Sequence, residues 1–166
     1  MITIEQIKEL LALEPHPEGG YFAQTYCASE EIPLAALPTR YKSARAHGTA
    51  IYYLLTPETC STFHRLQSDE IFHFYLGDPV EMVQLFPDGS GKVLQIGSDL
   101  LRGLTPQVLA PRGVWQGSRL APGGQFALLG CTVAPGFVYE DFEIGQRAAL
   151  LAAYPGFEAW ILALTQ

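Results

Sequence analysis

The spacing of hydrophobic and polar positions changes twice along the chain, and each change marks a different kind of element. Near the N-terminus, isoleucine and leucine recur at helical spacing, and Thr3 with Gln6 has the form of a capping box. We therefore expect a short amphipathic helix over about residues 4–13. Near the C-terminus, the same spacing predicts helical stretches within about residues 146–164, interrupted at Pro155.

Between these ends, short runs of β-branched and aromatic residues alternate with turn signals. The clearest run is Thr49–Leu55, and Pro87-Asp88-Gly89-Ser90-Gly91 is typical of a hairpin turn. Residues 15–21 contain two prolines and two glycines, which exclude a helix or a central strand there. Further strands are predicted over residues 61–66, 70–76, 80–86, 92–96, 107–109, 114–118, 125–133 and 137–142. About eight to ten short strands in a small domain indicate a sandwich or barrel rather than βαβ units.

The composition predicts a hydrophobic core and argues against some classes of partner. The 166 residues are 48% hydrophobic and 16% charged, which is enough apolar material for one domain spanning 1–166. A net charge of −7 argues against nucleic acid as a partner, because binding to a phosphate backbone needs clustered Lys and Arg. No apolar run approaches the ~20 residues of a membrane helix, and the N-terminus lacks a signal-peptide layout. We therefore expect a cytoplasmic protein with no membrane partner.

The candidate chemistry lies on two adjacent predicted strands. Side chains alternate between the faces of a strand, so His64 is assigned to one face of the first strand. In the second strand, Glu70 shares a face with Phe72 and Phe74. His73 points to the opposite face and can join Glu70 only through a bulge.

These residues resemble a known family. His64, Glu70 and Gly77 match part of the first cupin motif, H-x-H-x3-E-x6-G, and residues 111–116 are similar to the second, P-x-G-x2-H. The wider likeness is to the Cupin_5 (DUF985) family of the RmlC-like cupin superfamily and covers about residues 13–165; it rests on residues 16–21, 49–55, 68–75, 130–137 and 140–143. The resemblance implies an all-β double-stranded β-helix, a jelly-roll cupin barrel over about residues 20–143. It further implies a pocket in the barrel mouth, short flanking helices and commonly a homodimer.

The departures from the cupin pattern concern the metal. In metal-using cupins, both histidines of the first motif, its glutamate and the histidine of the second motif hold a divalent ion. The second histidine position holds Leu66 here, and the second-motif position holds Gln116. Leucine offers no lone pair, and an amide is a poor ligand for transition metals. No cofactor is therefore predicted, and a metal, if present, would take His64, Glu70 and Gln116 as ligands.

What remains is acid–base chemistry. A histidine beside a carboxylate can act as a general base, because the carboxylate sets its tautomer and raises its basicity. His64 and Glu70 are accordingly the predicted catalytic residues. Each of the other candidates also has a plain structural interpretation as a core, turn or surface residue. The residues predicted to contact a ligand are Gln116, Tyr52, Arg65, Phe72, Phe74, Glu18, Arg45 and His73.

Three functions stay open for a small-molecule ligand in the pocket. The favoured one is a metal-independent epimerase- or isomerase-like enzyme acting on a sugar or other polar metabolite, by analogy with the sugar-nucleotide epimerases of the superfamily. It rests on the retention of His64 and Glu70 while two metal ligands are lost. The second is a non-catalytic metabolite-binding protein. The third is a metal-dependent oxygenase or isomerase with an atypical ligand set that recruits His16 or His73.

Overall fold

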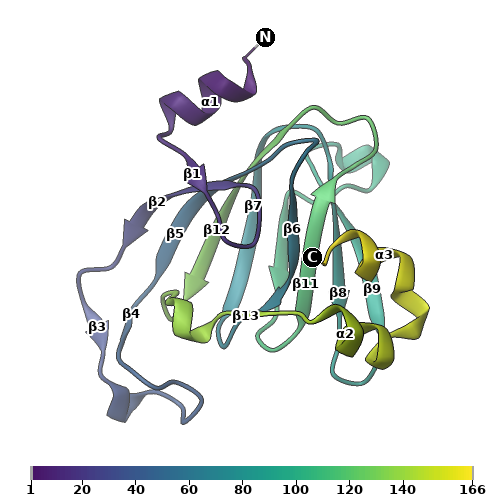
Figure 1. The fold of residues 1–166 in the computed structure, drawn as a ribbon. Helices are drawn as coiled ribbons and strands as arrows, with labels where there is room; N and C mark the ends of the chain where they lie inside the picture. The colour runs from purple at the N-terminus through teal and green to yellow at the C-terminus, as the bar shows by residue number, and fades with distance from the viewer. Residues whose placement is uncertain (1, 166) are drawn as a thin grey trace.

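The computed structural model describes residues 2–165 and consists mainly of two antiparallel sheets that face each other (Figure 1). This arrangement confirms the predicted all-β class. The larger sheet has the order β1 (Glu14–Pro15), β2 (Tyr21–Cys27), β5 (Thr49–Leu55), β12 (Ala127–Ala134), β7 (Asp69–Gly77) and β10 (Gln107–Ala110). The smaller sheet has the order β13 (Glu143–Ile144), β6 (Cys60–Arg65), β11 (Trp115–Leu120), β8 (Val80–Leu85) and β9 (Gly91–Ile96). A separate pair joins β3 (Glu31–Ile32) to β4 (Arg45–Ala46).

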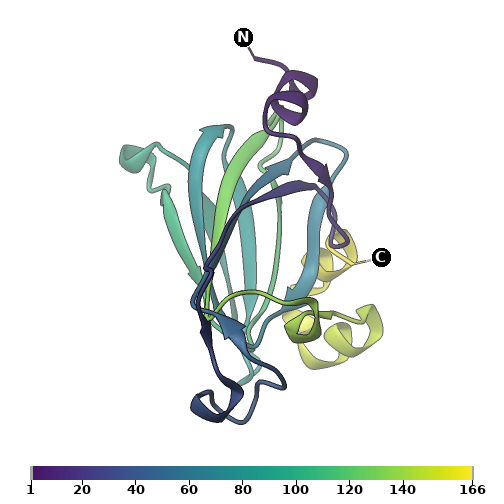
Figure 2. The ribbon, with the colours of Figure 1, turned by 90° about the vertical axis from the view of Figure 1, so that its left-hand side faces the viewer.

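Short helices flank the sheets, as the sequence predicted. They are α1 (Ile4–Leu10), α2 (Arg147–Ala153) and α3 (Glu158–Ala163). The capping box of Thr3 and Gln6 is confirmed, and α1 ends near Ala12, whose φ of 51° is left-handed. In Figure 2, α1 and the segment carrying β3 lie at opposite ends of the barrel. No helix in residues 2–165 is long and apolar enough to cross a membrane.

Hydrophobic side chains fill three separate regions. The interior between the sheets holds a cluster that includes Tyr53, Phe72 and Leu129, each at most 1% exposed. On the outer face of the smaller sheet, Phe63 packs with side chains of α2 and α3. Because strand positions alternate, Phe63 outside the barrel places its neighbour His64 inside. The third region lies under α1 and includes Ile7.

Several segments differ from the sequence predictions. The two-residue strands β1, β3, β4 and β13 were not predicted, and neither was the longer β2. In β2, four of the seven residues are exposed, and the polar Gln24 and Thr25 interrupt its apolar pattern. Residues 137–142 were predicted to form a strand but contain a 3-10 turn at Tyr139–Asp141. Asp141 within that turn is buried against Arg45, so a long-range ion pair replaces the expected strand pairing.

Candidate functional site

A cavity of about 130 Å³ lies among the inward-facing side chains of the barrel. Strand register explains its lining, because residues directly opposite each other share a face. Thr49 pairs with Val133, which pairs with Glu70, so three neighbouring strands contribute one row of the wall. The lining residues are His16, Glu18, Phe22, Gln24, Thr49, Ile51, His64, Leu66, Glu70, Cys131, Val133, Phe137, Tyr139 and Phe142.

The turn before β2 carries Glu18 into this cavity. The Glu18 carbonyl accepts hydrogen bonds from the Thr62 amide at 2.9 Å and the Thr62 hydroxyl at 3.0 Å, and the Tyr53 hydroxyl donates to the Gly19 carbonyl at 2.7 Å. Gly19 has a φ of 104°, and a Cβ there would collide with the backbone of β6. The close approach therefore requires glycine at this position. The expectation that this segment is neither helix nor central strand is confirmed, and the segment lies against the cavity.

His64 and Glu18 form the central polar contact of the site. His64 Nδ1 lies 2.8 Å from the Thr62 carbonyl oxygen, which only accepts, so Nδ1 carries a hydrogen. His64 Nε2 lies 3.3 Å from Glu18 Oε2. Two lone pairs would repel at that distance, so a proton lies on one of these two atoms. Burial raises the pKa of Glu18 and lowers the pKa of His64, which favours the uncharged form of each group.

Glu70 is therefore not the direct partner of His64 that the sequence analysis expected. Glu70 belongs to the larger sheet and His64 to the smaller one, and the Glu70 Oε2 atom accepts a 2.6 Å hydrogen bond from Gln116 Nε2. Burial raises the pKa of Glu70 to about 7, opposed by the His64 charge and reinforced by Glu18. Gln116 is buried outside the cavity lining, and its Oε1 atom has no protein partner. Gln116 therefore contacts Glu70 in this structure, and its contact with a ligand stays a prediction.

Aromatic rings form the other half of the wall. The His16 and Phe22 rings meet edge to face at 4.6 Å, and Phe137 and Tyr139 do so at 5.1 Å. Phe142 lies 5.3 Å from His64 between ring centroids. The sequence analysis did not assign the three aromatic residues after β12 to the site. Their close spacing in the sequence was a signal, but the strand predicted over this segment obscured it.

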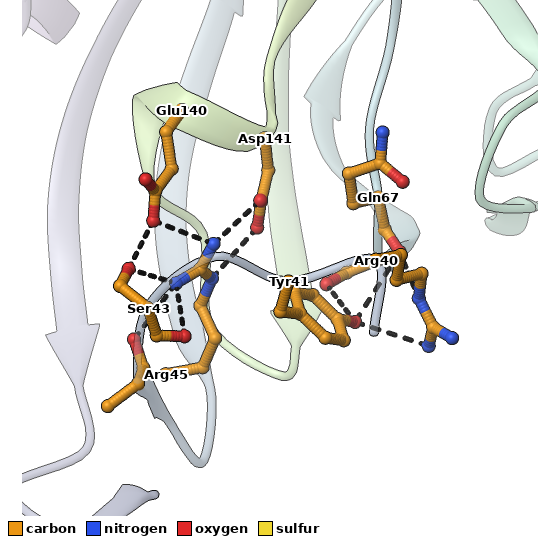
Figure 3. Close-up of polar contacts among 9 residues, drawn as sticks. Arg40, Tyr41, Ser43, Arg45, Gln67, Glu140 and Asp141 are labelled. Atoms are coloured by element: carbon orange, nitrogen blue, oxygen red, sulfur yellow. Dashed lines mark hydrogen bonds and ion pairs between the residues drawn. The ribbon is translucent and has the colours of Figure 1, made fainter. Parts of the chain in front are cut away.

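Arg45, predicted to contact a ligand, is already paired with acidic side chains in this structure. Its guanidinium is fully buried and makes a bidentate contact with Asp141, at 2.9 Å from Nε and 2.7 Å from Nη2, and it also contacts Glu140 and Ser43 (Figure 3). These acidic partners belong to the 3-10 turn that carries Tyr139. Arg45 therefore positions the turn that carries Tyr139 at the cavity. Each nitrogen of its guanidinium already donates to an acceptor and is not free to bind an anion.

Five other predicted ligand contacts also lie outside the cavity lining. Phe72 is buried in the interior core, and Phe74 packs against that core. Tyr52 packs in the α1 cluster and against Tyr75. Arg65 is paired with Glu143 at the surface, and its guanidinium covers Trp115. His73 is on the opposite face of β7 from Glu70, as its strand parity predicted, and contacts Thr132 and Gln107.

The donor set does not fit a tightly held transition metal. Leu66 stands in the wall and offers no lone pair, and the side-chain amide of Gln116 is a poor ligand for the transition metals that imidazole suits. Within residues 2–165, no group of three or more His, Cys, Asp and Glu side chains is arranged to hold an ion. We therefore derive no chemistry through a metal.

Comparison with known proteins places this geometry in a family. The protein SO0799 from Shewanella oneidensis has a solved structure with 36% identity and a TM-score of 0.88, covering 100% of this chain and 99% of that one. A hypothetical protein from Leishmania major has 32% identity and a TM-score of 0.88, covering 99% of both chains. The uncharacterised protein YML079W of Saccharomyces cerevisiae is 32% identical over 148 residues, which cover 84% of this chain and 73% of that protein. A family model described as Cupin superfamily (DUF985) matches residues 5–145. The chain belongs to the Cupin_5 (DUF985) family, as its motifs indicated.

Proposed function

We propose that the barrel cavity binds a small metabolite and transfers protons to and from it without a tightly bound metal, as an epimerase or isomerase does. The observation that carries this proposal is the 3.3 Å contact between His64 Nε2 and Glu18 Oε2 inside the cavity. The contact holds one proton between two groups, each of which can pass it on. Burying such a pair without a use for it is costly.

The cavity supplies two acid–base groups of different character. The His64–Glu18 pair holds a proton and can donate it to a ligand oxygen or carbon. Glu70, with a pKa raised by burial to about 7, exists in both protonation states near neutral pH and can accept a proton. A general base works best when its pKa lies near the working pH. One group that removes a proton and another that returns one are the requirement for inverting or isomerising a carbon centre.

Solvent isotope exchange tests this function directly. The protein is incubated in D2O with a mixture of polar metabolites, and mass spectrometry detects any compound that gains one deuterium at carbon. We expect exchange with the wild type and its loss in His64→Gln. His73→Gln is the matched control, because His73 lies on the outer face of the same barrel, and it should retain exchange.

Two results would contradict the proposal in different ways. Compounds that bind and stabilise the protein without gaining deuterium would favour the non-catalytic binding function. Stoichiometric transition metal in untagged protein, required for turnover, would favour the metal-dependent alternative. Equal exchange in the wild type and His64→Gln would remove His64 from the reaction.

A further inference from the structure

The side chains that line the cavity can supply negative charge but no fixed positive charge. Glu18 and Glu70 are each only 7% exposed and both line the cavity, whereas no Lys or Arg of the described residues lines it. Burial lowers the pKa of His16 and of His64, so both rings are neutral near pH 7 and do not balance the acids. Burial also raises the pKa of Cys131 and Tyr139, which keeps these groups neutral. The wall can therefore carry negative charge and has no fixed positive charge.

Aromatic faces stand at steep angles around the same space. The His16 and Phe22 planes differ by 89°, the Phe137 and Tyr139 planes by 80°, and the Tyr139 and Phe142 planes by 82°. Aromatic rings that line a cavity can attract a cation through their ring faces, and this is how proteins bind methylated ammonium groups. Tyr139 lines the cavity and is 53% exposed.

We infer that the ligand of this cavity is a small organic cation with an ammonium head group. The inference rests on the proposed function, in which this same cavity receives a small molecule. The ammonium group would lie against the aromatic rings, and the carboxylate of Glu70, together with that of Glu18 once its proton is released, would balance the charge. A buried charge is tolerated when it is paired, and here the ligand supplies the missing partner.

Other ligand classes fit this wall less well. An anion such as a nucleotide diphosphate sugar would meet two acidic side chains and no Lys or Arg from the described lining. The charge of this cavity therefore does not support the analogy with sugar-nucleotide epimerases. A neutral polar ligand would leave any ionised carboxylate unpaired. The 130 Å³ cavity is about ten times the ~10–15 Å³ that one water needs, which corresponds to a ligand of about ten non-hydrogen atoms.

Calorimetric titration with an isosteric pair of probes tests the charge of the ligand. Choline and 3,3-dimethylbutan-1-ol have nearly the same shape, but only choline is charged. We expect choline to bind at least about tenfold more tightly than the neutral alcohol near pH 8. The advantage should shrink about tenfold near pH 5.5, because the cation competes with protons for Glu70 and Glu18.

Variants separate charge recognition from loss of the fold. Glu70→Gln and Phe142→Leu should each bring the ratio of the two affinities toward one, by removing a carboxylate or an aromatic face. Glu9→Gln, at an exposed position on α1, is the control and should keep the wild-type ratio. The affinity ratio is measured only on variants whose urea unfolding transitions show that they are folded.

The outcomes distinguish this inference from the proposed function. Equal or tighter binding of the neutral alcohol would overturn the cationic assignment while leaving a small-molecule cavity intact. Preferential binding of acetate, or tighter binding of Zn²⁺ or Mn²⁺ than of choline, would overturn it as well. If neither choline nor tetramethylammonium binds, the inference is wrong. If no compound of any charge binds, the proposed function fails with it.

Discussion

Replacing Glu70 with glutamine is expected to stabilise the folded protein above neutral pH, although the residue lies in the candidate site. Burial raises the pKa of Glu70 from its ordinary value of 4.5 to about 7. Ionising the buried carboxylate therefore costs folding free energy, and the neutral amide avoids this cost. The amide carbonyl oxygen can still accept the hydrogen bond from Gln116 Nε2, so the substitution keeps the local packing.

The size and sign of the effect follow from proton linkage. The folded and unfolded pKa values of Glu70, about 7 and 4.5, differ by about 2.5, which corresponds to about 3 kcal/mol. The folded state holds the proton more tightly than the unfolded state. The stabilisation from this proton is complete below pH 4.5 and is lost as the pH rises to about 7. The wild type should therefore lose about 3 kcal/mol relative to Glu70→Gln between about pH 4.5 and pH 8.

Equilibrium urea unfolding, followed by the fluorescence of Trp115 and Trp160, measures this difference. Transitions are recorded at intervals from about pH 5 to pH 8.5 for both proteins, and the difference in unfolding free energy is plotted against pH. Other titrating groups act in both proteins and largely cancel in the difference. Glu9→Gln, which replaces an exposed acid with its amide, should show no such trend.

Parallel pH profiles for the wild type and Glu70→Gln would refute the reasoning. They would mean that Glu70 ionises as easily in the folded protein as in the unfolded chain. A difference of the opposite sign, with Glu70→Gln weaker at high pH, would mean that a cationic partner compensates the carboxylate in the free protein. Either result would also show that Glu70 is not a base with a pKa near neutrality.

Four further predictions concern the supports of the site and its assembly. Arg45→Met should cost about 3–5 kcal/mol in urea unfolding, because it leaves Asp141 buried and unpaired; a cost no larger than the ~1 kcal/mol expected for Arg65→Met at its exposed ion pair would contradict this. Gly19→Ala should destabilise the protein more than Gly89→Ala, because both have positive φ but only a Cβ at Gly19 meets backbone; equal losses would count against it. Light scattering should show a homodimer, and a monomer at all concentrations would contradict this. Elemental analysis of untagged protein should find no stoichiometric transition metal, and one ion per chain would overturn the interpretation of Leu66.

Much of the fold could be predicted because strand and helix signals are local. The run of β-branched and aromatic residues over Thr49–Leu55 predicted β5 with its observed bounds, and the capping box predicted the start of α1. The sequence predictions failed where the local pattern was weak or where a long-range contact determined the structure. The strand β2 buries too little to show alternation. Residues 137–142 have strand-forming side chains, but the buried pair of Asp141 and Arg45 holds them in a turn.

The candidate site was predictable in part for the same reason. Parity along a strand correctly separated His73 from Glu70, because alternation is fixed by the backbone. It could not identify Glu18 as the partner of His64, since a turn far away in the sequence delivers that carboxylate. It also could not show that Arg45 is neutralised by acids of another segment.

The sequence by itself determined the fold class, the family and the separation of His73 from Glu70 on opposite faces of one strand. These properties depend on side-chain periodicity, turn residues and motif spacing, all of which lie within short stretches of chain. Only the tertiary structure decided which polar groups meet, which charges are already paired, and that aromatic rings and two buried acidic side chains line one cavity. Such contacts join segments that are distant along the chain, and their pKa values depend on the burial that the whole barrel creates.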